Sequence, residues 1–97
     1  MEPVSERTVT ATILSVEKVR GKFQHLVQTD HGGYRTALNS SLGFIIESYA
    51  PREYQNIWPI VTLTLRRSRR YEYIINIQGK NAIDIGIEQR TQNSVTY

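Results

Sequence analysis

The chain has 97 residues, of which 39% are hydrophobic and 22% are charged, and its formal net charge is +3. This length fits one compact domain and excludes a second domain of ordinary size, including a separate dinucleotide-binding domain. The absence of cysteine excludes disulfides, cysteine-bound zinc, iron–sulfur clusters and a thiol nucleophile. Eleven isoleucines, nine threonines and six tyrosines favour strands over helices.

The chain is expected to begin with a flexible terminus over residues 1–6, followed by a long strand over residues 7–19. In this strand apolar and polar residues alternate, but the apolar positions change phase near residues 13–15. A strand that changes phase must change the face that it buries or carry an extra residue. The pattern therefore predicts a β-bulge or a sharp bend at this point.

Two shorter strands are predicted next, over residues 22–29 and 34–38. The residues between them, 30–33, end in two glycines, which adopt the positive φ of tight turns without steric cost. A hairpin around this loop would place Thr29 opposite Tyr34.

A helical segment is predicted over residues 42–58. Residues 39–41 are Asn-Ser-Ser, which are typical helix N-cap residues. Pro51 interrupts the segment and Pro59 ends it. Trp58 is expected to fill part of the core. One helical face would carry Leu42, Ile45, Ile46 and Tyr49.

The rest of the chain predicts strands over residues 60–65 and 71–78, joined by an arginine-rich turn. An additional strand is predicted over residues 82–88, where isoleucine alternates with other residues, and a polar tail over residues 89–97. A single domain would then cover residues 7–88. Alternation in the fifth strand would place four residues on one face: Tyr71, Tyr73, Ile75 and Ile77.

Three strands, a helix and two strands, with a long bent first strand, follow one another over residues 7–78. This order (β-β-β-α-β-β) resembles the OB-fold, a mainly β, five-stranded Greek-key barrel with one helix. The resemblance is one of element order and of loop charge, and it implies single-stranded nucleic-acid-binding domains as the related family. Small SH3-like barrels and other α+β folds are the alternatives.

Positive charge is concentrated in two segments, each of which contains a predicted connection between strands. Residues 18–22 carry +3 and residues 59–80 carry +4, whereas the rest of the chain is net acidic. The resemblance implies that these two loops flank one binding face. Their cations are Lys18, Arg20, Lys22, Arg66, Arg67, Arg69 and Arg70.

Aromatic residues lie beside these cations in the sequence. A protein that binds single-stranded nucleic acid needs cations along the phosphates and rings on which bases stack, and arginine suits both tasks. The predicted function is therefore non-enzymatic binding of single-stranded DNA or RNA with low sequence specificity. The candidate residues are the seven cations above together with Phe23, Tyr34, Arg35, Tyr71 and Tyr73.

Other interpretations stay open. The arginine-rich turn is also typical of a solvated turn whose charges keep strand edges from pairing with other chains. Each of the four aromatic residues could instead pack in the core. The alternative function is a protein–protein interaction module whose basic loop meets an acidic partner, and free strand edges could support a homo-oligomer.

Catalytic chemistry has little support in the sequence. His25 and His31 are the two histidines, and with the scattered carboxylates they match no catalytic or metal-binding spacing. We therefore expect no enzyme, no metal and no cofactor. The polar first residues do not resemble a signal peptide, and no apolar run approaches the roughly 20 residues that cross a bilayer. A soluble cytoplasmic protein without membrane contact is expected.

Overall fold

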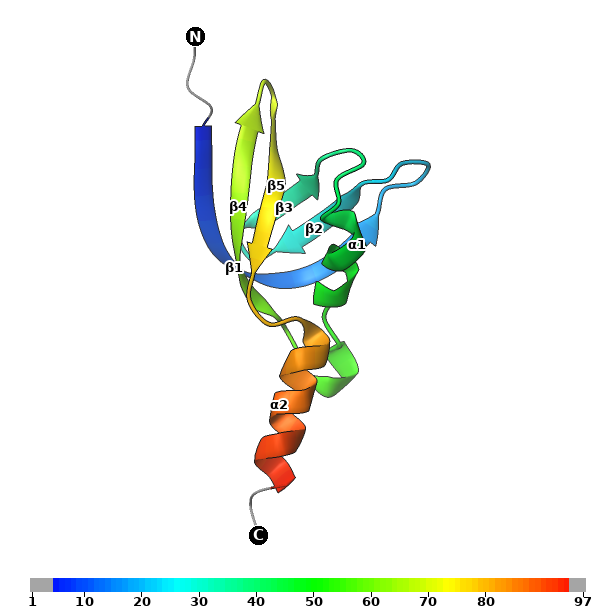
Figure 1. Ribbon diagram of the computed structural model, residues 1–97, viewed down its shortest axis with the longest axis vertical. Helices are drawn as coiled ribbons and strands as arrows, with labels where there is room; N and C mark the ends of the chain where they lie inside the picture. Colours follow the sequence, from blue (N-terminus) through cyan, green and yellow to red (C-terminus); the bar gives the residue numbers. More distant parts are fainter. Residues whose placement is uncertain (1–4, 95–97) are drawn as a thin grey trace.

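The computed structural model describes residues 5–94 and is mainly β, as predicted (Figure 1). Two α-helices and two short 3-10 helices accompany the strands. The elements in chain order are β1 (Ser5–Lys18), β2 (His25–Thr29), β3 (Gly32–Thr36), α1 (Gly43–Ile46), η1 (Glu47–Tyr49), η2 (Glu53–Gln55), β4 (Ile60–Ser68), β5 (Tyr71–Gln78) and α2 (Ala82–Ser94).

The five strands form a closed ring in the order β1-β2-β3-β5-β4, and β4 pairs back with β1. All neighbouring strands are antiparallel except β3 and β5, which run parallel. The parallel pair is short, with Arg35 opposite Tyr73 and Thr36 opposite Ile74. This pair joins the β1-β2-β3 meander to the β4–β5 hairpin.

β1 is long and bent because it pairs with two different strands. Its first part runs beside β4 as far as Thr12, and its second part runs beside β2 from Ile13 onwards. The register shifts between Ile13 and Ser15, which confirms the predicted bulge. Leu14 is the extra residue and is exposed, while Ile13 is fully buried. The change of phase therefore lets one strand serve both sides of the ring.

The hairpin between β2 and β3 is tighter than predicted. Thr29 pairs with Gly32, and Val27 rather than Thr29 lies opposite Tyr34. The turn has only two central residues, because Gly32 takes a φ of +126° and joins β3. The Thr29 hydroxyl donates to the Gly32 carbonyl at 2.8 Å and accepts from the His31 amide at 3.0 Å.

The face predicted for β5 is wrong at Ile77, which is buried whereas Tyr71 and Ile75 are exposed. Thr64 pairs with Asn76 but Leu65 pairs with Ile74, so Ile75 is an extra residue in β5. Ile74 is fully buried and Ile75 is 36% exposed, and the bulge lets Ile77, three residues after Ile74, face the core as well.

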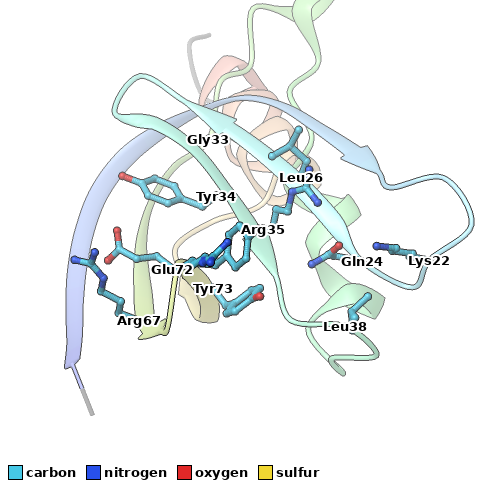
Figure 2. Close-up of a pocket in the computed structure, with 12 residues that line it drawn as sticks. Lys22, Gln24, Leu26, Gly33, Tyr34, Arg35, Leu38, Arg67, Glu72 and Tyr73 are labelled. Carbon is cyan, nitrogen blue, oxygen red and sulfur yellow. The ribbon is translucent and has the colours of Figure 1, made fainter. Parts of the chain in front are cut away.

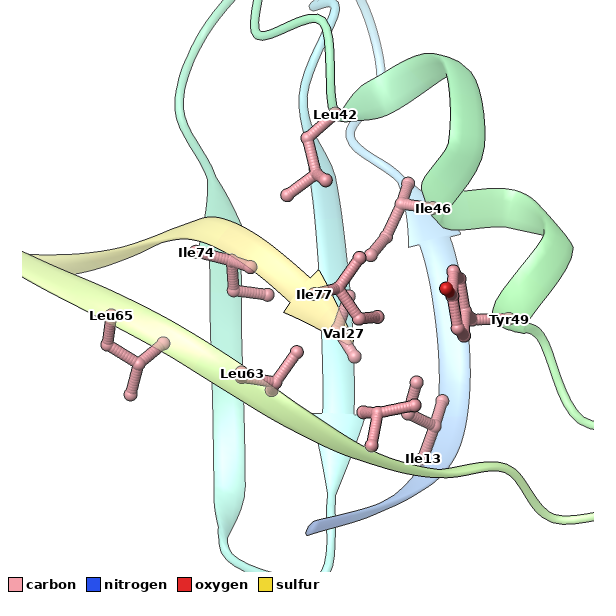
Figure 3. Packing of buried hydrophobic residues seen from close by; sticks show 10 residues of the cluster. Ile13, Val27, Leu42, Ile46, Tyr49, Leu63, Leu65, Ile74 and Ile77 are labelled. Carbon is pink, nitrogen blue, oxygen red and sulfur yellow. The ribbon is translucent and has the colours of Figure 1, made fainter. Parts of the chain in front are cut away.

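The core fills the inside of the ring, and α1 with η1 closes one end of it (Figure 3). The predicted helix is instead one turn of α-helix followed by two 3-10 turns, because Pro51 breaks it. From this segment Leu42, Ile46 and Tyr49 enter the core, and Ile45 is exposed. The core cluster comprises Ile13, Val27, Leu42, Ile46, Tyr49, Val61, Leu63, Leu65, Ile74 and Ile77.

Trp58 does not fill the core as predicted. Its side chain is exposed, and its indole N–H donates to the Asn56 side-chain oxygen at 3.2 Å. The neighbouring Ile57 is buried in its place. Asn56 has a φ of +55° and ends η2, which turns the chain so that Ile57 faces inward.

The additional strand predicted over residues 82–88 is wrong, because these residues begin α2. The Asn81 side chain accepts a hydrogen bond from the Asp84 amide at 2.9 Å and caps the helix. α2 continues to Ser94, so the predicted polar tail does not begin at residue 89.

At the other end of the chain, Ser5 and Glu6 belong to β1 and not to the predicted flexible terminus. The remaining predicted terminal residues, 1–4 and 95–97, lie outside the described part of the chain. Within the described residues, neither helix is both long enough and apolar enough to span a lipid bilayer.

Candidate nucleic-acid interface

A groove of about 600 Å³ is lined mainly by residues of β2, β3 and β5 (Figure 2). Lys22, from the connection between β1 and β2, lies at one end, and Arg67 of β4 lies at the other. Seven of the twelve predicted site residues line this groove: Lys22, Tyr34, Arg35, Arg67, Arg70, Tyr71 and Tyr73. Residues from both cationic segments therefore border one surface.

Arg35 lies in the middle of the groove because of the strand pairing beneath it. It is opposite Leu26 on β2 and opposite Tyr73 on β5. The next residue, Thr36, is buried, so alternation along β3 turns Arg35 outward. Within residues 5–94 no carboxylate lies within ion-pair distance of the Arg35 guanidinium, which leaves it available to a bound anion.

Two tyrosines of β5 form an aromatic pair beside the arginine-rich turn. The ring centroids of Tyr71 and Tyr73 are 6.1 Å apart with an interplanar angle of 48°. Tyr71 is 61% exposed, and Tyr73 is half-buried. Tyr34 is also half-buried, and its hydroxyl donates to the His31 carbonyl at 3.4 Å. Tyr71 thus offers the most accessible ring surface for stacking in the groove.

Glu72 lies between these two tyrosines in the chain and is the carboxylate that lines the groove. Arg7 Nε and Nη2 each donate to one of its oxygens at 2.8 Å. This hydrogen bonding, aided by the positive charges of Arg7 and Arg67, holds the pKa of Glu72 below its ordinary value. The same contact raises the pKa of Arg7. Glu72 therefore carries a negative charge that Arg7 compensates.

Five predicted site residues lie outside the groove: Lys18, Arg20, Phe23, Arg66 and Arg69. Arg66 does not line it and pairs with Glu6, with Nη2 and Oε2 3.2 Å apart. Arg69 occupies the tip of the β4–β5 hairpin with a φ of +55°. Phe23 packs close to α1, and the Lys18 ammonium lies 6.0 Å from its ring centroid.

Sequence reasoning missed five residues that line the groove: Gln24, Leu26, Gly33, Leu38 and Glu72. Gln24 is buried, and its side-chain amide donates to the Thr36 carbonyl at 3.0 Å. Four of these residues carry no charge or aromatic ring that would mark them in the sequence. The position of Glu72 inside an otherwise basic segment was the one available signal.

The histidines do not belong to the groove. His25 is buried, with Nε2 2.9 Å from a Glu47 oxygen, and His31 lies in the turn between β2 and β3. Within residues 5–94 no three histidine, aspartate or glutamate side chains gather closely enough to hold a metal ion.

The chain was compared with models of protein families, with curated proteins and with solved structures, and none of these matched.

Proposed function

We propose that this chain is an OB-like Greek-key barrel that binds single-stranded nucleic acid without catalysis. The observation that carries the proposal is the groove, which gathers cations from two separate connections around the Tyr71–Tyr73 pair. The ring order, with its parallel β3–β5 contact and a short helix between β3 and β4, supports the OB-like architecture.

Binding in this groove would rest on two interactions. The groove-lining cations, Lys22, Arg35, Arg67 and Arg70, would contact phosphates along the strand. The exposed ring of Tyr71, packed on Tyr73, would stack on bases. Such stacking tolerates any base sequence, because every base has a π-face. Such a site favours single strands over duplexes, because duplex bases are already stacked on one another.

The test is a titration of a labelled single-stranded oligonucleotide of about 16 nucleotides, the upper end of the site sizes of single OB folds. The expected result is binding that weakens as salt rises, because phosphate contacts release counterions. A duplex of the same length should compete poorly. Absence of binding at low salt, or binding without salt dependence, would overturn the proposal. Binding of polyglutamate with equal affinity would favour the alternative, an acidic protein partner.

A further inference from the structure

The phenyl ring of Phe44 is exposed to solvent near the basic connection between β1 and β2. It is 79% exposed and belongs to α1, outside the groove. Its ring centroid lies 5.1 Å from that of Phe23, with an interplanar angle of 48°. The two rings form a second aromatic pair, similar in geometry to the Tyr71–Tyr73 pair.

The position of Phe23 is fixed from several sides. Its carbonyl accepts a hydrogen bond from the Asn39 amide at 2.8 Å. Its ring packs on Gly43, where an added Cβ would lie 2.9 Å from Phe23 Cε1. The ring also makes an edge contact with buried His25, at 6.1 Å between centroids. A ring that is held in this way loses little conformational freedom when a flat ligand stacks beside it.

This aromatic pair lies next to two residues that line the groove. Lys22 precedes Phe23, and Leu38 precedes Asn39, which is bonded to Phe23; both Lys22 and Leu38 line the groove. Figure 2 shows them on the same side of the groove, away from Arg67. The Phe23–Phe44 pair therefore lies next to residues at the Lys22 end of the groove.

The charge around the pair favours nucleic acid over an apolar protein partner. The Lys18 ammonium lies 6.0 Å from the Phe23 centroid, and Arg20 and Lys22 follow in the same connection. Glu47, the carboxylate nearest along α1 and η1, is already bonded to His25. An exposed ring packed on a half-buried one, with cations beside them, matches the base-and-phosphate pattern of a single strand.

We infer that Phe23 and Phe44 form a second stacking platform, and that one nucleic-acid strand spans both aromatic pairs. This inference rests on the proposed function. It makes affinity depend on length: a short strand occupies one pair, and a longer strand gains the second. The inference gives a binding role to Phe44, which the sequence pattern placed in a predicted helix and not among the candidate site residues.

The experiment measures the affinity of oligothymidylates of about 4 to about 16 nucleotides for wild type, Phe44→Ala and Tyr54→Ala. Tyr54 is the matched control, because it is 84% exposed but lies on η2, away from the groove. Phe44→Ala should weaken the binding of the longest oligonucleotide by about 5-fold to 100-fold and leave the shortest unchanged. Tyr54→Ala should bind every length as wild type does.

Wild-type affinity of Phe44→Ala at every length would overturn the inference while leaving the proposed function intact, and so would an equal loss at every length. If the wild type binds no oligothymidylate at all, the proposed function itself fails. A second readout is photocrosslinking with 5-iododeoxyuridine at each end of the longest oligonucleotide. A crosslink in the peptide that contains Phe44 is expected, and crosslinks confined to the Tyr71 peptide would contradict the second platform.

Discussion

Arg7 on β1 and Glu72 on β5 are joined by two hydrogen bonds of 2.8 Å, although β4 separates their strands in the ring. Pairing places Arg7 opposite Leu65 and Glu72 opposite Arg67, so the contact reaches across β4. The positive charge of Arg7 also compensates the negative charge of the Glu72 carboxylate, which lines the groove. The ion pair thus connects the closure of the ring with the electrostatics of the proposed binding site.

The first prediction concerns acid stability. The folded-state pKa of Glu72 is lowered from its ordinary value of 4.5, so the contact stabilises the fold fully above that pH. The stabilisation is lost as the pH falls through the lower folded-state pKa. Urea unfolding at pH 7 should therefore show Glu72→Gln less stable than wild type, and the difference should vanish in strong acid. A difference that persists unchanged at low pH would contradict this.

The same substitution should strengthen nucleic-acid binding. Glu72→Gln removes a negative charge from the groove and releases the Arg7 guanidinium for a phosphate. One additional phosphate contact would steepen the plot of log affinity against log salt by about 0.7. Titration at several salt concentrations checks this, and weaker binding by Glu72→Gln would show that the carboxylate itself contacts the ligand.

The bulge in β5 leads to a prediction about the free energy of unfolding. Ile74 is fully buried, so Ile74→Ala should lower the free energy of unfolding by about 2 to 5 kcal/mol. Ile75 is the bulged residue and is partly exposed, so Ile75→Ala should cost less than about 1 kcal/mol. Urea denaturation of both variants gives the comparison, and a larger loss for Ile75→Ala would place the bulge elsewhere.

These elements show which parts of the fold could be predicted from the sequence. The β1 bulge was predictable because the change of phase near Ile13 is a local pattern. The face of β5 was not, because the bulge at Ile75 depends on how β5 pairs with β4. α2 was missed because alternating isoleucines match the period of a strand, whereas the signal for the helix is the cap at Asn81.

The candidate site was predictable only as far as charge and aromatic character mark it. Arg67 and Tyr71 stood out in the sequence, and both line the groove. Arg66 stood out equally but pairs with Glu6, a contact between residues 60 positions apart. The compensation of Glu72 by Arg7 also depends on strand order, which a linear reading could not supply.

The tip of the β4–β5 hairpin offers a test of backbone strain. Arg69 has a φ of +55°, which costs a residue with a Cβ about 1 kcal/mol and costs glycine almost nothing. Arg69→Gly should therefore raise the free energy of unfolding by up to about 1 kcal/mol. Because Arg69 does not line the groove, binding should change little. Thermal unfolding checks the first effect; a lowered midpoint would contradict it.

The most direct test of the central claim compares two variants that lose the same charge. Arg67→Ala/Arg70→Ala removes two cations from the groove, and Arg52→Ala/Arg69→Ala removes two cations that do not line it. The measurement is the slope of log affinity for a single-stranded oligonucleotide against log salt. The groove variant should bind more weakly, with a slope shallower by about 1.4, and the control should keep the wild-type slope. Equal slopes for the two variants would contradict the assignment of this groove as the binding site.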